Sequence, residues 1–222
     1  MNKKVWIYTA VACVLLIAFA ALTVALTCVD VRAAGESGAE VGFATLNEAV
    51  FKALGQEEIG LKLSDLCGAL LIAAVGAFGV TGLVQVIRRK GILRADKELY
   101  VMAGGLVLLA AAYLFFEVVV INCRPVLEQG ELAASYPSSH AMLAVAVAGM
   151  GAAYLFKHLK TKVWHGSLGS FLIGLACVTV SLRLFGGVHW LTDIVGGVLL
   201  GLVITFAYLS VCSVFERKGE QA

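Results

Sequence analysis

The stretch VWIYTAVACVLLIAFAALTVALTCV, residues 5–29, contains 25 consecutive residues without a charged side chain. A helix needs about 20 apolar residues to cross the hydrocarbon core of a bilayer. Five further apolar runs follow along the chain: Leu66–Ile87, Leu99–Cys123, Ala141–Phe156, Gly166–Leu182 and Ile194–Phe215. No run alternates apolar and polar residues with a period of two, which excludes a membrane β-barrel. The sequence therefore predicts an all-α, polytopic membrane protein with six transmembrane helices in a bundle.

The composition agrees with this prediction. Of the 222 residues, 60% are apolar and 14% are charged, and the mean hydropathy is +0.92. A soluble domain is about 45–50% apolar and about 25% charged. The composition excludes a disordered chain and a disulfide scaffold, and the net charge of +2 indicates no nucleic-acid partner. We expect one integral membrane domain over residues 1–222, with its motif-bearing core at about 99–215.

The positions of Lys and Arg predict the orientation in the membrane. Of the 17 basic residues, 12 lie in the N-terminal segment, in the loops at 88–97 and 157–162, and in the tail at 217–218. Cytoplasmic loops carry an excess of Lys and Arg. Because six spans put all these segments on one side, we expect both termini in the cytoplasm. The first run is too long for a signal peptide and no clear cleavage site follows it, so we expect an uncleaved helix.

The loop between the first two runs, residues 30–64, has apolar residues at helical spacing: Phe43, Leu46, Val50, Phe51 and Leu54. This spacing predicts a short amphipathic helix that lies on the outer surface as an anchor, and a binding role for it stays open. The six cysteines have no paired spacing and indicate small packing residues, although a disulfide among Cys28, Cys67 and Cys123 stays open. Gly197-x-x-x-Gly201 predicts close packing between helices.

Polar residues gather at one level of the predicted bundle. All but the first of them map to the outer ends of the last four helices: Glu117, Arg124, Ser138, Ser139, His140, Arg183, His189 and Asp193. Ionisable groups at membrane depth are costly and usually face a cavity or a partner. We therefore expect a functional site where these four helices converge.

The spacing of these residues suggests a chemistry. His189 and Asp193 are four residues apart, so the carboxylate can hold one ring nitrogen and leave the other available as a base or nucleophile. Pro137 followed by Ser138 and Ser139 predicts a helix start, whose exposed amides attract an anion. Two arginines match phosphate oxygens in a bidentate way. Together these features favour phosphoryl transfer through a histidine.

The arrangement resembles the type-2 phosphatidic acid phosphatase family, the membrane lipid phosphate phosphatases related to vanadium haloperoxidases. That family carries Lys-x6-Arg-Pro, Pro-Ser-Gly-His and Ser-Arg-x5-His-x3-Asp. Arg124-Pro125 matches the end of the first motif, and residues 137–140 match the second except at its third place. Arg183, His189 and Asp193 match the third motif in spacing. The match extends from Glu117 to Asp193, and the six-helix layout extends the resemblance over most of the chain.

The resemblance implies a role for each histidine. His189 is the expected nucleophile that takes the phosphoryl group, and Asp193 is expected to orient it. His140 is the expected acid that protonates the leaving oxygen. A covalent phosphohistidine would divide one difficult displacement into two easier steps.

The resemblance also implies the binding groups and the partners. Arg124 and Arg183, with the amides near Ser138 and Ser139, form the expected phosphate-binding cradle. No metal and no cofactor is expected. The implied substrate is a lipid phosphate of undecaprenyl, phosphatidylglycerol or phosphatidate type, within a cell membrane and with the site on the extracytoplasmic side. The sequence does not distinguish these lipids, and it does not indicate an oligomeric state.

Three positions depart from the family motifs. Glu117 stands where Lys is expected, Ser139 where Gly is expected, and Leu182 where Ser is expected. We expect Glu117 on the same helix face as Arg124, paired with it, or else paired with Arg183 or protonated. Each arrangement weakens the positive field at the site. Our hypothesis is a modulating role for Glu117, with a weakly charged substrate or a slower enzyme.

Other interpretations of the same residues stay open. His189 and Asp193 can form a purely structural pair, and the two arginines can extend toward lipid headgroups. His140, His189, Asp193 and Glu117 can ligate a metal, although two neighbouring arginines disfavour a dication. The second functional class is a non-catalytic lipid-phosphate binder or transporter that retains the cradle. Such a binder would keep its affinity without His189, whereas the enzyme would lose its turnover.

Overall fold

The computed structural model describes residues 3–54, 58–127, 130–159 and 162–220. Among them, six helices are long and apolar enough to cross a membrane, which confirms the predicted multi-pass membrane fold. These are α1 (Lys3–Leu26), α3 (Glu58–Arg88), α4 (Lys97–Val118), α5 (Ser139–His158), α6 (Lys162–Phe185) and α7 (Leu191–Glu220). The shorter elements are β1 (Arg32–Ala33), β2 (Glu40–Val41), α2 (Ala44–Leu54) and the 3-10 turn η1 (Ile92–Arg94).

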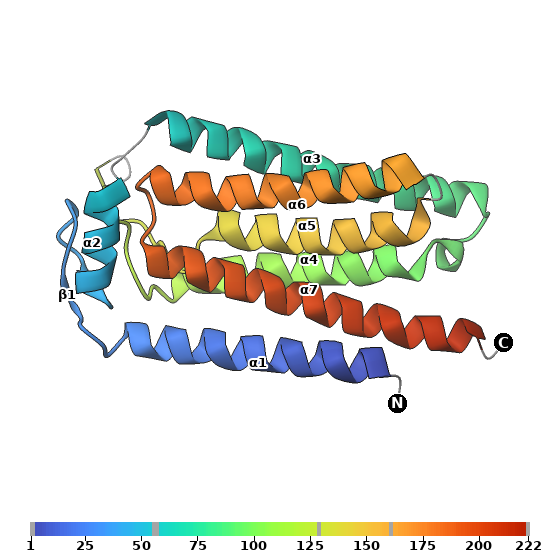
Figure 1. Ribbon diagram of the computed structural model, residues 1–222, viewed down its shortest axis with the longest axis horizontal. Helices are drawn as coiled ribbons and strands as arrows, with labels where there is room; N and C mark the ends of the chain where they lie inside the picture. Colours follow the sequence, from blue (N-terminus) through green and yellow to red (C-terminus); the bar gives the residue numbers. More distant parts are fainter. Residues whose placement is uncertain (1–2, 55–57, 128–129, 160–161, 221–222) are drawn as a thin grey trace.

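The six long helices run side by side in one bundle (Figure 1), in which α1 lies along α7 and α3 lies along α6. The most buried of them is α5, whereas α1, α3 and α4 expose most of their surface. That surface is apolar: the exposed fractions of Ile17, Ile72 and Val107 are 69%, 62% and 68%. Apolar side chains exposed around a bundle are suited to lipid rather than to water.

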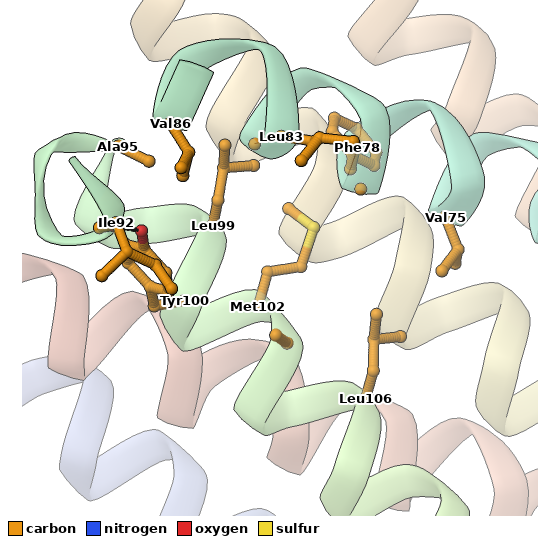
Figure 2. A pocket seen from close by; sticks show the side chains of 13 residues that line it. Val75, Phe78, Leu83, Val86, Ile92, Ala95, Leu99, Tyr100, Met102 and Leu106 are labelled. Carbon is orange, nitrogen blue, oxygen red and sulfur yellow. Dashed lines mark hydrogen bonds between the residues drawn. The ribbon is translucent and has the colours of Figure 1, made fainter. Parts of the chain in front are cut away.

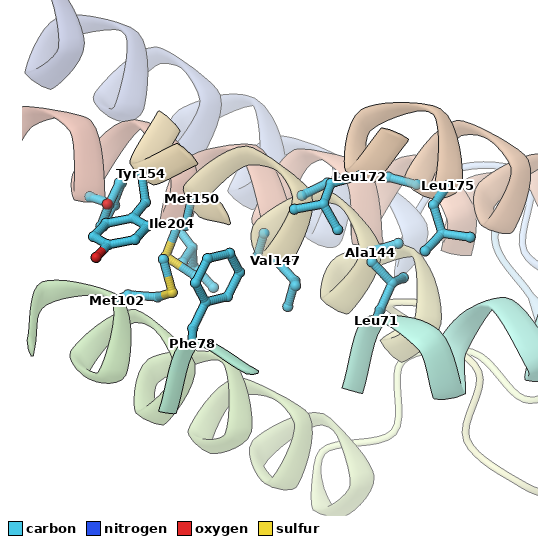
Figure 3. Close-up of a cluster of buried hydrophobic side chains, with 14 of the residues drawn as sticks. Leu71, Phe78, Met102, Ala144, Val147, Met150, Tyr154, Leu172, Leu175 and Ile204 are labelled. Carbon is cyan, nitrogen blue, oxygen red and sulfur yellow. The ribbon is translucent and has the colours of Figure 1, made fainter. Parts of the chain in front are cut away.

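The main hydrophobic cluster surrounds α5 (Figure 3). Phe78 from α3 and Met102 from α4 meet Met150 and Tyr154 of α5, and Ile204 of α7 adds to this group. Residues of α6 also belong to this cluster, so four other helices contribute to it and α5 forms the axis on which they pack.

Glycines let α7 approach α5 closely. A Cβ atom built at Gly197 would lie 2.5 Å from the carbonyl oxygen of Ser138, and one at Gly201 would lie 2.8 Å from the Cβ of Val145. Real Cβ atoms do not come so close to other heavy atoms, so only glycine fits at these two places. The predicted packing role of Gly197 and Gly201 is confirmed.

An apolar cavity of about 310 Å³ lies between α3 and α4 (Figure 2). Its walls include Phe78 and Leu83 of α3, Leu99 and Met102 of α4, and Ile92 of η1. The cavity therefore lies toward the end of the bundle at which η1 joins α3 to α4, and none of the described residues that line it is charged.

The two ends of the bundle differ in structure. Helix α1 begins and α7 finishes at one end, here called the termini end, whereas β1, β2 and α2 lie at the other, here called the cap end (Figure 1). The predicted basic loop at 88–97 joins α3 to α4 at the termini end. Because the chain runs between the two ends an even number of times, the start of α1 and the end of α7 lie at the same end.

At the cap end, the predicted amphipathic helix is α2, and it packs on the start of α7. Its Asn47 is 1% exposed and donates to the hydroxyl of Thr192 at 2.9 Å, while the Thr192 amide donates to Asn47 Oδ1 at 3.2 Å. Phe51 of α2 packs against Trp190. The buried face of α2 thus includes a polar residue, and Leu46 of the predicted apolar stripe is exposed. The six cysteines, including Cys28, Cys67 and Cys123, are free thiols.

Candidate active site

The predicted site residues lie at the cap end of the bundle. The segment between α4 and α5 supplies Arg124 and Ser138, the start of α5 supplies Ser139 and His140, and the end of α6 supplies Arg183. His189 precedes α7, and Asp193 lies in the first turn of α7. The fold therefore brings segments more than 60 residues apart in the sequence to one end of the molecule.

Two signals in the sequence place His189 beside Asp193. Gly187 adopts a positive φ of 64° and ends α6, and the chain then turns directly into α7. Asp193 is the third residue of α7, and its Oδ2 accepts the backbone N–H of Trp190 at 3.0 Å, as in a capping box. Asp193 Oδ2 lies 3.8 Å from Nδ1 of His189. The predicted pair is present, with a separation longer than a hydrogen bond.

Asp193 is held on both of its oxygens. Asn122 donates from Nδ2 to Oδ1 at 3.0 Å, opposite the contact of Oδ2 with the Trp190 amide. Both Asp193 and Asn122 are almost completely buried. Because a buried carboxylate is costly unless it is hydrogen-bonded, these donors make the charged side chain tolerable and also fix its orientation.

Burial lowers the pKa of His189, whose side chain is almost completely enclosed. The Asp193 carboxylate acts in the opposite direction, and the positive charges of Arg124 and Arg183 lower the pKa further. The lowered pKa favours the neutral form of His189, the state required of a nucleophile. Both arginines lie near enough to act on His189, which a phosphate cradle around this histidine requires.

The predicted position of Arg124 on the third helix is wrong. Helix α4 ends at Val118, six residues before Arg124. The run Val118-Val119-Val120-Ile121 is β-branched and favours extended backbone, and Arg124 donates its backbone N–H to Ala133 in a short antiparallel contact. Glu117 and Arg124 are therefore not two turns apart on one helix face. Glu117 is exposed, and it has no ion-pair partner among the described residues.

A narrow polar cavity of about 20 Å³ nevertheless brings several predicted residues together. Glu117, Arg124, Ser139 and His189 all line it, with Tyr136 and other residues of the 134–137 segment. The predicted nucleophile, one arginine and the start of α5 thus face one space. Glu117 lines the same space, so its negative charge lies where the family motif has a positive one.

The two seryl positions differ in what they can bind. The Ser138 amide donates to the carbonyl of Asp193 at 2.9 Å, and the residue is fully buried, so this amide is already used inside the protein. Helix α5 begins at Ser139 after Ser138 as its N-cap, as predicted, but without a hydrogen bond from the Ser138 side chain. Of these two serines, Ser139 lines the cavity and Ser138 does not. Its amide is therefore the better candidate for a phosphate contact.

His140 and Arg183 form a second group beside the cavity. Arg183 Nη2 lies 2.7 Å from Nε2 of His140 and 3.2 Å from Oδ1 of Asp65 on α3. The His140 Nε2 is 3.7 Å from the same oxygen of Asp65. Arg183 is 4% exposed, so it does not extend into lipid headgroups. Ser181, next to the missing motif serine, is exposed and donates to Cys177 of its own helix, so it does not replace that serine.

Two polar contacts of this site were not predicted. Asn122 lies in the third apolar run, where a lone amide two residues before Arg124 was an unused signal. Asp65 lies at the boundary between the outer loop and the second run, and nothing in its local sequence connects it with His140, 75 positions later. Among the residues that the structure describes, no group of three His, Cys, Asp or Glu side chains forms a metal-binding cluster.

Known proteins resemble this chain in sequence and in fold. Residues 118–217, which contain all the predicted site residues except Glu117, match the family model described as PAP2 superfamily. The segment at 118–217 is therefore similar in sequence to the PAP2 superfamily. Phosphatidylglycerophosphatase B of Bacillus subtilis (strain 168) is 38% identical over 73 residues, which are 32% of this chain and 36% of that protein. The alignment thus spans about a third of the length of that relative.

The fold of the chain resembles a solved structure. A crystal structure of a transmembrane PAP2-type phosphatidylglycerolphosphate phosphatase from Bacillus subtilis matches with a TM-score of 0.62 and 22% sequence identity. The match covers 93% of this chain and 96% of the other. The fold is therefore shared over nearly the whole length of both proteins.

Proposed function

We propose that this chain is a membrane lipid phosphate phosphatase that works through a phosphohistidine on His189. The observation that carries the proposal is the cavity that His189, Arg124 and Ser139 share, next to a buried and doubly hydrogen-bonded Asp193. A neutral imidazole beside two guanidinium groups can attack a phosphorus atom while its charge is neutralised. If His189 and Asp193 formed a purely structural pair, two arginines close to the histidine would not be needed.

The proposed reaction has two steps. In the first, a nitrogen of His189 attacks phosphorus, the bond to the lipid oxygen breaks, and His140 donates a proton to that oxygen. In the second, water attacks the phosphohistidine, gives a proton to His140, and releases phosphate from His189. Arg124 and Arg183 stabilise the charge on the oxygens that stay on phosphorus, and Asp193 orients the nucleophile.

The name of the Bacillus subtilis relative favours phosphatidylglycerophosphate as the first substrate to test. The panel of lipids to be tested also contains undecaprenyl phosphates and phosphatidate, because each of them carries a phosphate at the end of an apolar tail. The basic loop at 88–97 lies at the termini end, and the excess of Lys and Arg in cytoplasmic loops supports a cytoplasmic location for that end. The cap end and the site then face the extracytoplasmic side.

The test is phosphate release by purified full-length protein in lipid–detergent micelles, with a chelator present. We expect release from at least one lipid of the panel, and loss of about 10³-fold or more in His189→Ala. His158→Gln, a histidine change at the opposite end of α5, is the matched control and should retain turnover. Binding of the lipids without release by the wild type would overturn the proposal and favour the non-catalytic binder.

A further inference from the structure

Asp65 contacts the second histidine of the site from a helix that none of the motifs includes. Its Oδ1 lies 3.2 Å from Nη2 of Arg183 and 3.7 Å from Nε2 of His140. Gly68, three residues later on the same face of α3, approaches the same ring: a Cβ there would lie 3.1 Å from Cδ2 of His140. The absence of a side chain at Gly68 lets α3 pass beside His140 and bring Asp65 to it.

The charges around His140 indicate what the contact with Asp65 does. The guanidinium group of Arg183 is always charged and lies against the imidazole. A second positive charge on His140 would be repelled by it unless a negative group stood nearby. Within the described part of the chain, Asp65 is the carboxylate that forms an ion pair with His140. His189 has Asp193 in the equivalent place.

We propose that Asp65 is the positioning residue of His140: its carboxylate orients the imidazole and keeps a proton available there for the leaving oxygen. The inference rests on the proposed phosphatase function. In the first chemical step the proton moves from His140 to the lipid oxygen as the phosphorus–oxygen bond breaks and the bond from phosphorus to His189 forms. In the second step His140 regains a proton from the attacking water. Asp65 exchanges no proton in either step.

This role differs from that of a residue that only anchors Arg183. An anchor would affect phosphate binding equally, whatever group leaves. A partner of the general acid would affect the reaction only where the leaving oxygen needs a proton. The dependence of the rate on the leaving group therefore separates the two roles.

The experiment compares phenyl phosphate with p-nitrophenyl phosphate, two esters of similar size. The p-nitrophenolate ion leaves readily without a proton, and phenolate does not. The measured quantity is kcat/KM, because it includes departure of the leaving group whichever step limits kcat. For Asp65→Asn we expect a loss of about tenfold with phenyl phosphate and of at most about twofold with p-nitrophenyl phosphate. The side chain of Asp65 is 58% exposed, so screening by water limits the effect to a part of general acid catalysis.

Two further variants make the comparison specific. Asp65→Glu keeps the charge and should recover a part of the phenyl phosphate activity. Glu58→Gln removes a carboxylate two turns earlier on α3, where Glu58 pairs with Lys62 in an exposed position, and should leave both rates unchanged. Thermal unfolding of each variant in detergent shows that it is folded.

Each outcome has one meaning. Selective loss with phenyl phosphate in Asp65→Asn, partial recovery in Asp65→Glu and no change in Glu58→Gln support the inference. Equal losses with both esters, or no loss, overturn it while the phosphatase proposal stands. No release from either ester or from the lipid panel by wild-type protein would overturn the phosphatase proposal itself.

Discussion

Replacement of Asn122 by alanine tests whether the buried amide holds Asp193 for catalysis. The amide donates to Asp193 Oδ1 at 3.0 Å and accepts the backbone N–H of Gly42 at 3.4 Å. The first contact joins a neutral donor to a carboxylate in a buried setting, and such hydrogen bonds contribute about 1.5–3 kcal/mol. The longer contact adds less. Asn122→Ala should therefore lower the free energy of unfolding by about 2–3 kcal/mol.

Loss of the hydrogen bond from Asn122 to Asp193 should also lower kcat/KM. Without Asn122, the Trp190 amide is the one donor to Asp193 besides His189 among the residues that the structure describes, and the carboxylate can rotate away from the histidine. Loss of the orientation of His189 by Asp193 would remove about 1.5–3 kcal/mol of transition-state stabilisation. Because 1.36 kcal/mol corresponds to a factor of ten in rate, kcat/KM would fall by about 10–100-fold. The assay is phosphate release from the best lipid of the panel, with thermal unfolding measured in the same micelles.

The control for Asn122 is Asn47→Ala. Asn47 is equally buried and also hydrogen-bonds a neighbouring backbone, but it contacts Thr192 and Gly42 rather than Asp193. We expect a comparable fall in unfolding temperature with kcat/KM within about threefold of wild type. The reasoning would be refuted by an Asn122→Ala protein that is destabilised yet hydrolyses the lipid at the wild-type kcat/KM, because the amide would then be structural only.

Three further predictions concern packing, pH and charge. Gly197→Ala should lower the free energy of unfolding by about 1–3 kcal/mol, because its Cβ would lie 2.5 Å from the Ser138 carbonyl oxygen and push α7 away from α5. The neutral control is Gly174→Ala in α6, where a Cβ has no atom within 4 Å. Equal unfolding temperatures of the two variants would contradict the packing argument. The pKa of His189 is lowered by burial, so below the ordinary histidine pKa of about 6.5 the unfolded state binds a proton that the folded state does not. The contribution of His189 to stability should then fall as the pH falls from about 6.5 toward the folded pKa, by at most about 1.4 kcal/mol per pH unit. Unfolding curves of His189→Gln measured between pH 7.5 and 5 should therefore have a smaller slope than those of the wild type. Glu117→Lys reverses a charge that lines the cavity and should lower the inhibition constant of orthovanadate by about two- to fivefold, with Glu117→Gln intermediate; weaker inhibition would assign Glu117 a positive role in binding.

The spans and the motif residues were predictable from the sequence because both depend on local features. A membrane helix needs only a run of apolar residues of sufficient length. Asp193, in the first turn of α7, reaches back to Trp190 and His189 just before the helix, as a capping residue does. The start of α5 after Pro137 is equally local, since the proline and the N-cap serine act on their own backbone. The structure confirms these elements at or near the predicted positions.

The end of α4 and the use of the Ser138 amide were not predictable in this way. The run at 118–121 is apolar enough to continue a membrane helix, and only its antiparallel contact near Ala134 draws Arg124 away from the helix axis. The Ser138 amide looks available for an anion in the sequence, yet the carbonyl of Asp193 occupies it. Neither outcome follows from helical spacing, because Arg124 pairs with Ala133 across a loop and the Ser138 amide pairs with Asp193 of another helix.

The sequence by itself determined that the chain crosses the membrane six times and carries two histidines, two arginines and an aspartate in the spacing of a phosphoryl-transfer site. Only the tertiary structure decided which side chains hold those groups in place: Asn122 on Asp193, Asp65 on His140, and α2 over the start of α7. The physical reason is that spacing along a helix determines which residues share a face, whereas contact between helices depends on their rotation and depth. Those quantities follow from the packing of the whole bundle, including the glycine contacts that join α7 to α5.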